Sequence, residues 1–279
     1  MNWQANQRQS RTESFRRRIE GHTDPTLRIA VLAAHPDDET IGVSALLARF
    51  PQSAIVYVTD GAPRDRSLWP PGMTCAREEY AEVRRQEAAK ALAHAGIGEE
   101  QISWLGASDQ EAILEARTLA LKVAEFLRDH TVDLLITHPY EGGHPDHDSA
   151  ALVGRRAISM LDGAAPELFE MTSYHVRNGQ CVTGEFLNSE PSSEIVLEMS
   201  DQDCERKRKM MEEYRSQRLV LQNFPITNER LRMAPEYDFS RTPHEGKLWY
   251  ECMGWPMTGL RWRGLALAAF ADRPESSCD

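Results

Sequence analysis

An acidic cluster follows directly on an apolar run near the start of the chain, in the stretch VLAAHPDDETIG at residues 31–42. It brings His35, Asp37, Asp38 and Glu39 close together along the chain. Neighbouring carboxylates repel each other, which costs stability unless a cation or strong hydrogen bonds compensate. If a helix begins near Asp38, the side chains of Asp37 and Asp38 point about 100° apart, so one can bind a metal while the other faces what the metal activates. The cluster therefore favours a cation site, with solvation or helix capping as the competing interpretation.

A second polar loop, THPYEGGHPDHD at residues 137–148, also follows a predicted strand. It offers several imidazole and carboxylate groups: His138, Glu141, His144, Asp146 and His147. In open α/β sheets, ligands bind beyond the carboxyl ends of the strands, so both loops should face one crevice. Without thiolates nearby, such ligands suit zinc, with iron, cobalt or manganese left open. A catalytic zinc site uses three protein ligands, and His35, Asp38 and one histidine of the second loop would complete that set.

The elements that must position these loops alternate between strand and helix patterns. Short β-rich runs without clean alternation lie at residues 27–34, 53–61, 102–106 and 132–139, as expected for strands covered on both faces. Helical patterns lie between and after them, at residues 40–50, 75–96, 109–130 and 149–161. This order predicts an α/β fold: a Rossmann-like, mostly parallel sheet with helices on both faces.

The rest of the chain extends this core without a convincing linker. Strands are expected at residues 168–176 and 194–200 and a charged helix at residues 201–217, while the proline-rich tail beyond Leu219 predicts loops and short strands. We therefore expect one domain over residues 1–279, with a core at about 27–180 and an irregular C-terminal extension at about 181–279 that shapes the substrate pocket. The basic segment at residues 1–20 is interpreted as a solvated arm or a short surface helix.

Composition limits the partners. The formal net charge of -11 makes nucleic acid an unsuitable partner and favours a small neutral or cationic ligand. No apolar run approaches the ~18 residues of a membrane span, and the N-terminus has no apolar signal core, so we expect a cytoplasmic protein. The 5 cysteines are scattered and argue against a disulfide framework or a thiolate site. The sequence leaves a homo-oligomer open.

Taken together, AHPDDE after the first strand and HPDH in the second loop resemble the LmbE/PIG-L family of zinc-dependent N-acetylglucosaminyl deacetylases. The resemblance covers about residues 27–149. It implies one Zn²⁺ per chain, held by His35, Asp38 and His147, with Asp37 as the general base. It also implies that His144 assists the departing amine or the oxyanion, and that Asp146 supports His144.

Other residues are weaker candidates. The resemblance suggests that Tyr140 offers its hydroxyl to the oxyanion, although a loop tyrosine is more often a packing residue. The long loop at residues 60–79 holds Arg64 and Trp69, which could contact a sugar. Arg84 belongs to an Arg-x-x-Glu pattern that resembles one in the family and could bind substrate, although an ion pair within a helix explains it equally well.

These observations predict a metal-dependent N-deacetylase that acts on an N-acetylglucosamine-type amino sugar. A water activated by the metal and Asp37 would attack the acetamide, and His144 would protonate the leaving amine. On this view the rate should fall at high pH as His144 loses its proton. An amidase for a bulkier amide of a glucosamine-containing thiol conjugate remains an alternative with the same catalytic residues. A non-catalytic metal-binding module or a receiver-like domain is a further alternative of a different class.

Overall fold

The computed structural model describes the chain at residues 3–20, 26–188 and 193–271. Within these residues a seven-stranded sheet has the strand order β3-β2-β1-β4-β5-β9-β8. Strands β3 to β5 of that order run parallel, whereas β9 is antiparallel to β5 and to β8. The strands are β1 (Ile29–Ala33), β2 (Ala54–Thr59), β3 (Ile102–Ala107), β4 (Leu134–Thr137), β5 (Glu167–Met171), β8 (Glu194–Glu198) and β9 (Asn228–Met233). A separate hairpin consists of β6 (Tyr174–Arg177) and β7 (Gln180–Thr183).

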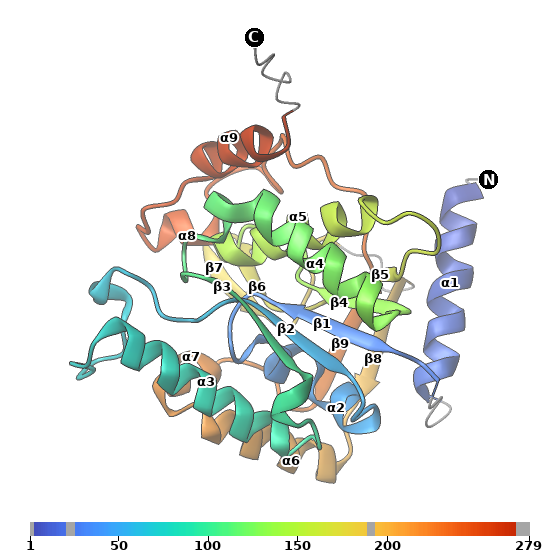
Figure 1. The fold of residues 1–279 in the computed structure, drawn as a ribbon, viewed down its shortest axis with the longest axis horizontal. Coiled ribbons are helices and arrows are strands. Elements are labelled where there is room, and N and C mark those ends of the chain that lie inside the picture. The colour runs from blue at the N-terminus through green and yellow to red at the C-terminus, as the bar shows by residue number, and fades with distance from the viewer. Residues whose placement is uncertain (1–2, 21–25, 189–192, 272–279) are drawn as a thin grey trace.

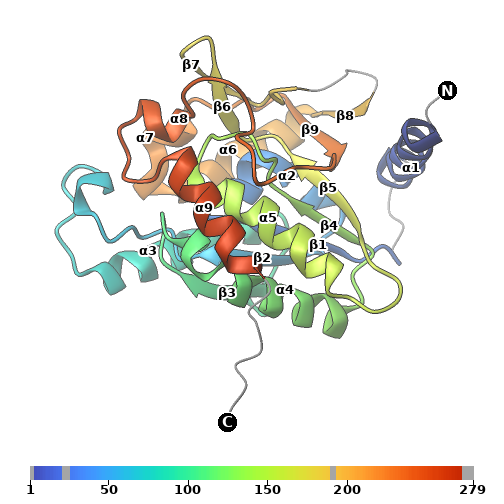
Figure 2. The same cartoon turned by 90° about the horizontal axis from the view of Figure 1, so that it is seen from above.

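Separate groups of helices cover the two faces of the sheet (Figures 1 and 2). One face is covered by α2 (Asp38–Arg49), α3 (Arg77–Ala93) and α6 (Asp201–Glu213). The other is covered by α4 (Ala116–His130), α5 (Pro145–Ser159) and α9 (Gly259–Phe270). Along β1, Val31 and Ala33 face the first group of helices and Leu32 faces the second. Because both faces are buried, every position of β1 is apolar, which is the pattern that predicted this fold.

The basic N-terminal segment forms a helix, α1 (Trp3–Glu20), which lies beside the β8 and β9 edge of the sheet (Figure 1). Phe15 packs on Phe169 of β5, with ring centroids 4.5 Å apart. Arg16 Nη2 donates to the carbonyl of Glu194 at 2.9 Å. Of the two predictions for this segment, the surface helix is confirmed.

Three elements differ from the sequence-based expectation. The strand expected at residues 168–176 is divided into β5 and β6. The helix expected from residue 109 begins as a short 3₁₀ turn at Ala112–Glu115, and α4 follows only from Ala116. The tail contains α7 (Arg218–Leu221), α8 (Trp249–Cys252) and α9, and it contributes β9 to the sheet. The local sequence signals for these parts are weak, because contacts with the core stabilise them more than local propensity does. The sequence pattern therefore did not predict them correctly.

A buried ion pair lies at a break in α2. The helix is interrupted at Val43, whose φ of -146° is not helical. Lys207 of α6 donates from Nζ to the carbonyl of Ile41 at 2.7 Å, before the break. The carboxylate of Glu229 in β9 accepts from the backbone N–H of Ala45 at 3.0 Å, after the break, and lies 3.2 Å from Lys207 Nζ. The break deprives the carbonyl before it and the N–H after it of their hydrogen-bond partners within the helix. Lys207 and Glu229 replace these partners with charged groups.

We expect Lys207→Met to lower the free energy of unfolding by about 3–5 kcal/mol, because it leaves the Glu229 carboxylate buried without its counter-ion. Lys207→Met combined with Glu229→Gln should be closer to wild type than Lys207→Met alone, since no buried charge then remains. The exposed Lys209 of the same helix gives a matched control, and Lys209→Met should change stability by less than about 0.5 kcal/mol. Urea denaturation of the four proteins measures these differences. A loss below about 1 kcal/mol for Lys207→Met would contradict the expectation.

Candidate active site

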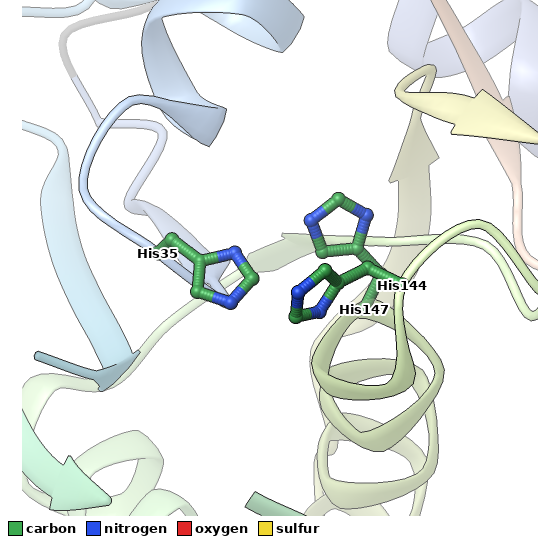
Figure 3. Close-up of side chains that lie close together, drawn as sticks. All are labelled: His35, His144 and His147. Atoms are coloured by element: carbon green, nitrogen blue, oxygen red, sulfur yellow. The ribbon is translucent and has the colours of Figure 1, made fainter. Parts of the chain in front are cut away.

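Both polar loops lie at the carboxyl ends of neighbouring parallel strands. His35 follows β1, and His144 and His147 lie at the start of α5, which follows β4. Because β1 and β4 pair in the sheet, the three imidazoles point toward one another across one crevice (Figure 3). The ring centroids of His35 and His144 are 4.4 Å apart, and those of His35 and His147 are 5.3 Å apart. The sequence-based expectation of a shared crevice is therefore confirmed.

Asp38 lies between the two loops. Its Oδ1 is 3.2 Å from His147 Nε2, and its Oδ2 is 3.4 Å from His35 Nδ1. Atoms bound to one tetrahedral zinc at about 2.0–2.1 Å lie about 3.3 Å from each other, and each of the two spacings has this size. The spacings involve different oxygens of Asp38, and Oδ2 also accepts from the backbone N–H of His35 at 2.7 Å. Ser173 Oγ lies 3.2 Å from His147 Nδ1 and fixes the ring from behind.

His138 supports this arrangement from the core. It is fully buried, its Nε2 lies 3.2 Å from Asp38 Oδ2, and its ring stacks on His147 with centroids 4.0 Å apart. His138 is thus a core residue behind the site. Its ring contacts two predicted ligands and lies outside the set of residues that line the cavity.

The charges at the site favour a cation. Burial lowers the pKa of His147 to about 3, so its ring is neutral and has a lone pair for a metal. Burial also acts to lower the pKa of His35, but Asp109 and the other carboxylates around it outweigh this and raise the pKa well above its ordinary value. When no metal ion is bound, a proton on His35 therefore supplies the positive charge that the surrounding carboxylates favour.

Within the described residues, three groups of side chains could share an ion: His35 with His144 and His147; His35 with Asp109, His144 and Asp146; and Asp38 with His138 and His147. The predicted ligands His35, Asp38 and His147 span two of these groups. Neutral imidazoles and carboxylates without a thiolate are a donor set that fits zinc. The position of Asp109 also favours a cation at this site. Its Oδ1 is buried, makes no hydrogen bond, and lies 3.4 Å from His35 Nε2.

Asp37 is held in a strained conformation at the edge of the site. Its φ of 123° lies in a region that non-glycine residues rarely adopt, and such strain costs about 1–3 kcal/mol. The Glu39 carboxylate accepts from its backbone N–H at 3.1 Å, and Arg84 Nη2 donates to its Oδ2 at 2.9 Å. Burial raises the pKa of Asp37 to about 7, while the charge of Arg84 acts to lower it. A carboxylate with such a pKa can take and release a proton near neutral pH.

Arg84 and Glu39 are themselves part of a buried network. Arg84 is almost fully buried, and its Nη1 lies 3.4 Å from Glu87, so the predicted ion pair within the helix is present. The Arg84 guanidinium also donates to the carbonyl of Pro36. Tyr214, at the end of α6, donates to Glu39 Oε1 at 2.6 Å. Although Arg84 lines the cavity, its charge is directed to Asp37, so its geometry supports a positioning role in place of the predicted contact with substrate.

His144 faces the cavity with one nitrogen. Its Nδ1 accepts from the backbone N–H of Asp146 at 3.1 Å, so the neutral ring carries its proton on Nε2. The Gln110 side-chain amide lies 2.6 Å from that Nε2 and should face it with the amide oxygen, which has no other partner. Burial and the neighbouring His35 and His147 lower the pKa of His144 well below its ordinary value. This direction favours a neutral ring at rest, whereas the sequence-based mechanism expects a protonated ring that loses its proton at high pH.

Asp146 supports the site differently from the prediction. Its carboxylate lies 3.9 Å from His144 Nδ1 but 3.2 Å from His35 Nε2. It also accepts from the backbone N–H groups of Gln110 at 2.6 Å and Ala112 at 3.0 Å. Asp146 thus holds His35 and the loop after β3, and supports His144 only through its own backbone N–H.

Three predicted residues lie outside the cavity. Tyr140 donates its hydroxyl to the carbonyl of Arg241 at 2.8 Å and packs among aromatic side chains, so its predicted role at the oxyanion is not supported. Trp69 is buried, donates to the carbonyl of Pro63 at 2.7 Å, and cannot contact a sugar. Arg64 pairs with Glu111 at 3.0 Å beside a neighbouring cavity. Loop position alone could not separate packing from exposure at these residues.

Some residues of the site were not predicted from the sequence. The catalytic cavity has a volume of about 340 Å³, and its lining includes Asp109, Gln110 and Tyr174. Asp109 and Gln110 follow the strand β3, and Tyr174 follows β5, so their position after strand ends was the signal that could have found them. Among the aromatic residues of the C-terminal extension, Trp255 lines the cavity and packs against His144, with ring centroids 4.9 Å apart. Tyr250 and Trp262 are core residues.

The fold and the site together define an open α/β protein with a histidine and aspartate centre at the carboxyl ends of its parallel strands. Residues 30–158 match the family described as PIG-L: GlcNAc-PI de-N-acetylase. This part of the chain, which holds both paired motifs, therefore matches the PIG-L (LmbE-like) family that the motifs predicted. No curated protein sequence matches the chain.

Solved structures share the fold at low sequence identity. The N,N'-diacetylchitobiose deacetylase from Pyrococcus horikoshii is 18% identical with a TM-score of 0.52, and the match covers 80% of this chain and 92% of that one. A teicoplanin deacetylase complex is 15% identical with a TM-score of 0.54, covering 76% and 100%. The 4-carboxy-2-hydroxymuconate hydratase from Pseudomonas putida is 14% identical with a TM-score of 0.54, covering 76% and 98%. These likenesses establish the fold alone.

Among the described helices, none combines the length and the apolar character required to cross a bilayer.

Proposed function

We propose that the protein is a zinc-dependent amide hydrolase that removes the N-acetyl group from an amino sugar of the N-acetylglucosamine type. The observation that carries this proposal is that Asp37 and His144 line the same cavity as His35, Asp38 and His147. Binding of a cation would need neither a strained carboxylate with a pKa near 7 nor an imidazole N–H directed into the cavity. These two groups are the ones that amide hydrolysis requires.

In this proposal His35, Asp38 and His147 hold one zinc ion, which when bound polarises the amide carbonyl and makes water more acidic. Asp37 takes a proton from the attacking water. When substrate binds, the Nε2–H of His144 would exchange the Gln110 amide oxygen for the oxygen or nitrogen of the breaking amide. Because the neutral His144 ring has no second proton, the proton that reaches the leaving amine is the one taken by Asp37, which revises the predicted role of His144 as the acid.

The extension at residues 181–279 supports the proposed single domain with a pocket-shaping C-terminal part. Gln217, Phe224 and Trp255 line the cavity, although they lie beyond the core at residues 27–180. The substrate would be a small amino-sugar derivative, and a cytoplasmic location, the absence of nucleic acid partners and a homo-oligomer remain proposals.

The alternatives differ in how well the geometry supports them. A receiver-like domain would have the strand order 2-1-3-4-5, whereas this sheet has β3-β2-β1-β4-β5. In a non-catalytic metal-binding module, the strained backbone of Asp37 would serve no function. The amidase for a bulkier amide would need the same catalytic groups and a larger space beside them, so only its products separate it from the deacetylase.

We expect the purified protein to carry about one zinc ion per chain and to release acetate from N-acetylglucosamine derivatives, and a chelator should abolish this activity. A panel with N-acetyl and longer N-acyl groups, assayed for both acetate and free amine, tests the proposal. Amine release from the longer amides without acetate release from the acetamides would favour the bulkier-amide alternative. Absence of free amine from the whole panel with zinc-loaded protein would refute amide hydrolysis and favour a reaction such as that of the structurally similar hydratase.

A further inference from the structure

The catalytic cavity has apolar wall residues from two segments outside residues 30–158. Val220 and Leu221 of α7, with Phe224 just after it, belong to the first segment. Met253 and Trp255, which follow α8, line the same cavity. The zinc-binding and catalytic groups are thus bordered by five apolar or aromatic side chains.

Part of this wall is exposed at the mouth of the cavity. Val220 is 49% exposed and Met253 is 51% exposed, and the adjacent Leu219 is also exposed. Large apolar side chains gathered around a cavity mark binding sites more often than isolated ones do. The neighbouring His144 and Asp109 are polar, so the apolar side chains give the cavity two chemically distinct parts.

The described residues that line the cavity offer no free lysine or arginine to an anionic substituent. Among the described residues that line it, Arg84 is the only arginine and no lysine is present. Arg84 is already paired with Asp37 and Glu87. Arg215 and Arg218 line a separate groove on the other side of Leu221 and Phe224, which are common to both linings. A phosphate or carboxylate on the substituent would therefore find no free arginine or lysine in this cavity.

We propose that the substrate is an amino sugar that carries an uncharged apolar substituent, alkyl or aryl, and that this substituent lies against Val220, Met253 and Trp255. This inference rests on the proposed function and specifies its substrate class. Burying a methylene group of such a substituent stabilises the complex by about as much as transferring it out of water, so the gain should rise with chain length.

The test compares three synthetic glycosides of N-acetylglucosamine: methyl, n-hexyl and 5-carboxypentyl. With zinc-loaded protein, kcat/KM for acetate release should be about 10- to 100-fold higher for the hexyl than for the methyl glycoside. The carboxypentyl glycoside should lose most of this gain. Equal values for methyl and hexyl would overturn the inference while leaving the proposed function intact. A carboxypentyl glycoside better than hexyl would also overturn it and would assign the substituent to the arginine groove.

Substitutions of the apolar wall residues test where the substituent binds. Val220→Asn combined with Met253→Gln should reduce the ratio of hexyl to methyl kcat/KM several-fold, and both positions are exposed enough to tolerate the changes. Leu267→Gln on α9, at a position 57% exposed and outside the cavity lining, should keep the wild-type ratio. If no glycoside releases acetate, the proposed function fails, and calorimetry still tests the inference: hexyl N-acetylglucosaminide should bind more tightly than the methyl compound, and equal affinity would refute it.

Discussion

Asp37→Asn is expected to lower kcat by about 10²–10⁴-fold while the zinc content and the fold stay close to wild type. Asparagine keeps the shape of the side chain and can still accept from Arg84, but it cannot take a proton from water. The strained backbone at this position, with φ of 123°, is tolerated better by asparagine than by most residues. The loss should therefore arise from chemistry and not from misfolding.

The measurement combines steady-state kinetics, elemental analysis and thermal unfolding. Asp60→Asn is a matched control, because Asp60 is also buried and paired with an arginine, Arg77 at 2.7 Å, but does not line the cavity. It should keep activity within a few-fold of wild type. His147→Ala should lose zinc and activity together. If Asp37→Asn lost zinc as well, Asp37 would be a ligand and the roles of the two aspartates would be reversed.

The pH dependence of the wild type follows from the same residue. The rate should rise with pH as Asp37 loses its proton, because only the carboxylate can act as a base. Burial raises the pKa of Asp37 to about 7, and a cation bound beside it would lower that pKa. The acidic limb should therefore be centred at or below about pH 7 and should be absent from the residual activity of Asp37→Asn.

His144→Ala is expected to lower kcat by a similar factor of about 10²–10⁴ with little change in zinc content. The variant removes the Nε2–H that faces the cavity, and with it a donor to the charge that develops on the breaking amide. Burial and the neighbouring histidines lower the pKa of His144, so we expect a neutral ring that does not titrate as the pH rises above neutral. The pH–rate profile of the variant should keep the shape of the wild-type profile at a lower rate.

His94→Ala provides the control for this substitution, because His94 lies on the surface beside Glu213 and is not among the residues that line the cavity. Its kinetics should match wild type. A wild-type profile with an alkaline limb that disappears in His144→Ala would show that a cationic His144 protonates the leaving amine. That result would restore the role predicted from the motif. Loss of zinc in His144→Ala would instead make His144 a ligand, as one of the possible ion-sharing groups allows.

The sequence by itself determined the alternation of strands and helices and the place of the two motifs at strand ends. Both are local properties: apolar runs specify buried strands, and in a parallel sheet their carboxyl ends must share one edge. This is why the strand pattern alone places His35, Asp38 and the histidines of the second loop at one crevice, while the family resemblance singles out His147. The paired motifs also indicated the family.

Only the tertiary structure decided what each polar side chain faces. Tyr140 and Tyr174 both follow strands, yet Tyr140 packs in the core and Tyr174 lines the cavity. The protonation of His144 and the strain at Asp37 likewise depend on burial and on neighbours that are distant in the sequence, such as Arg84. The apolar wall comes from the tail, where local propensity is weak and packing against the core stabilises the elements. Such contacts have no period or spacing in the sequence, so they could not be predicted from it.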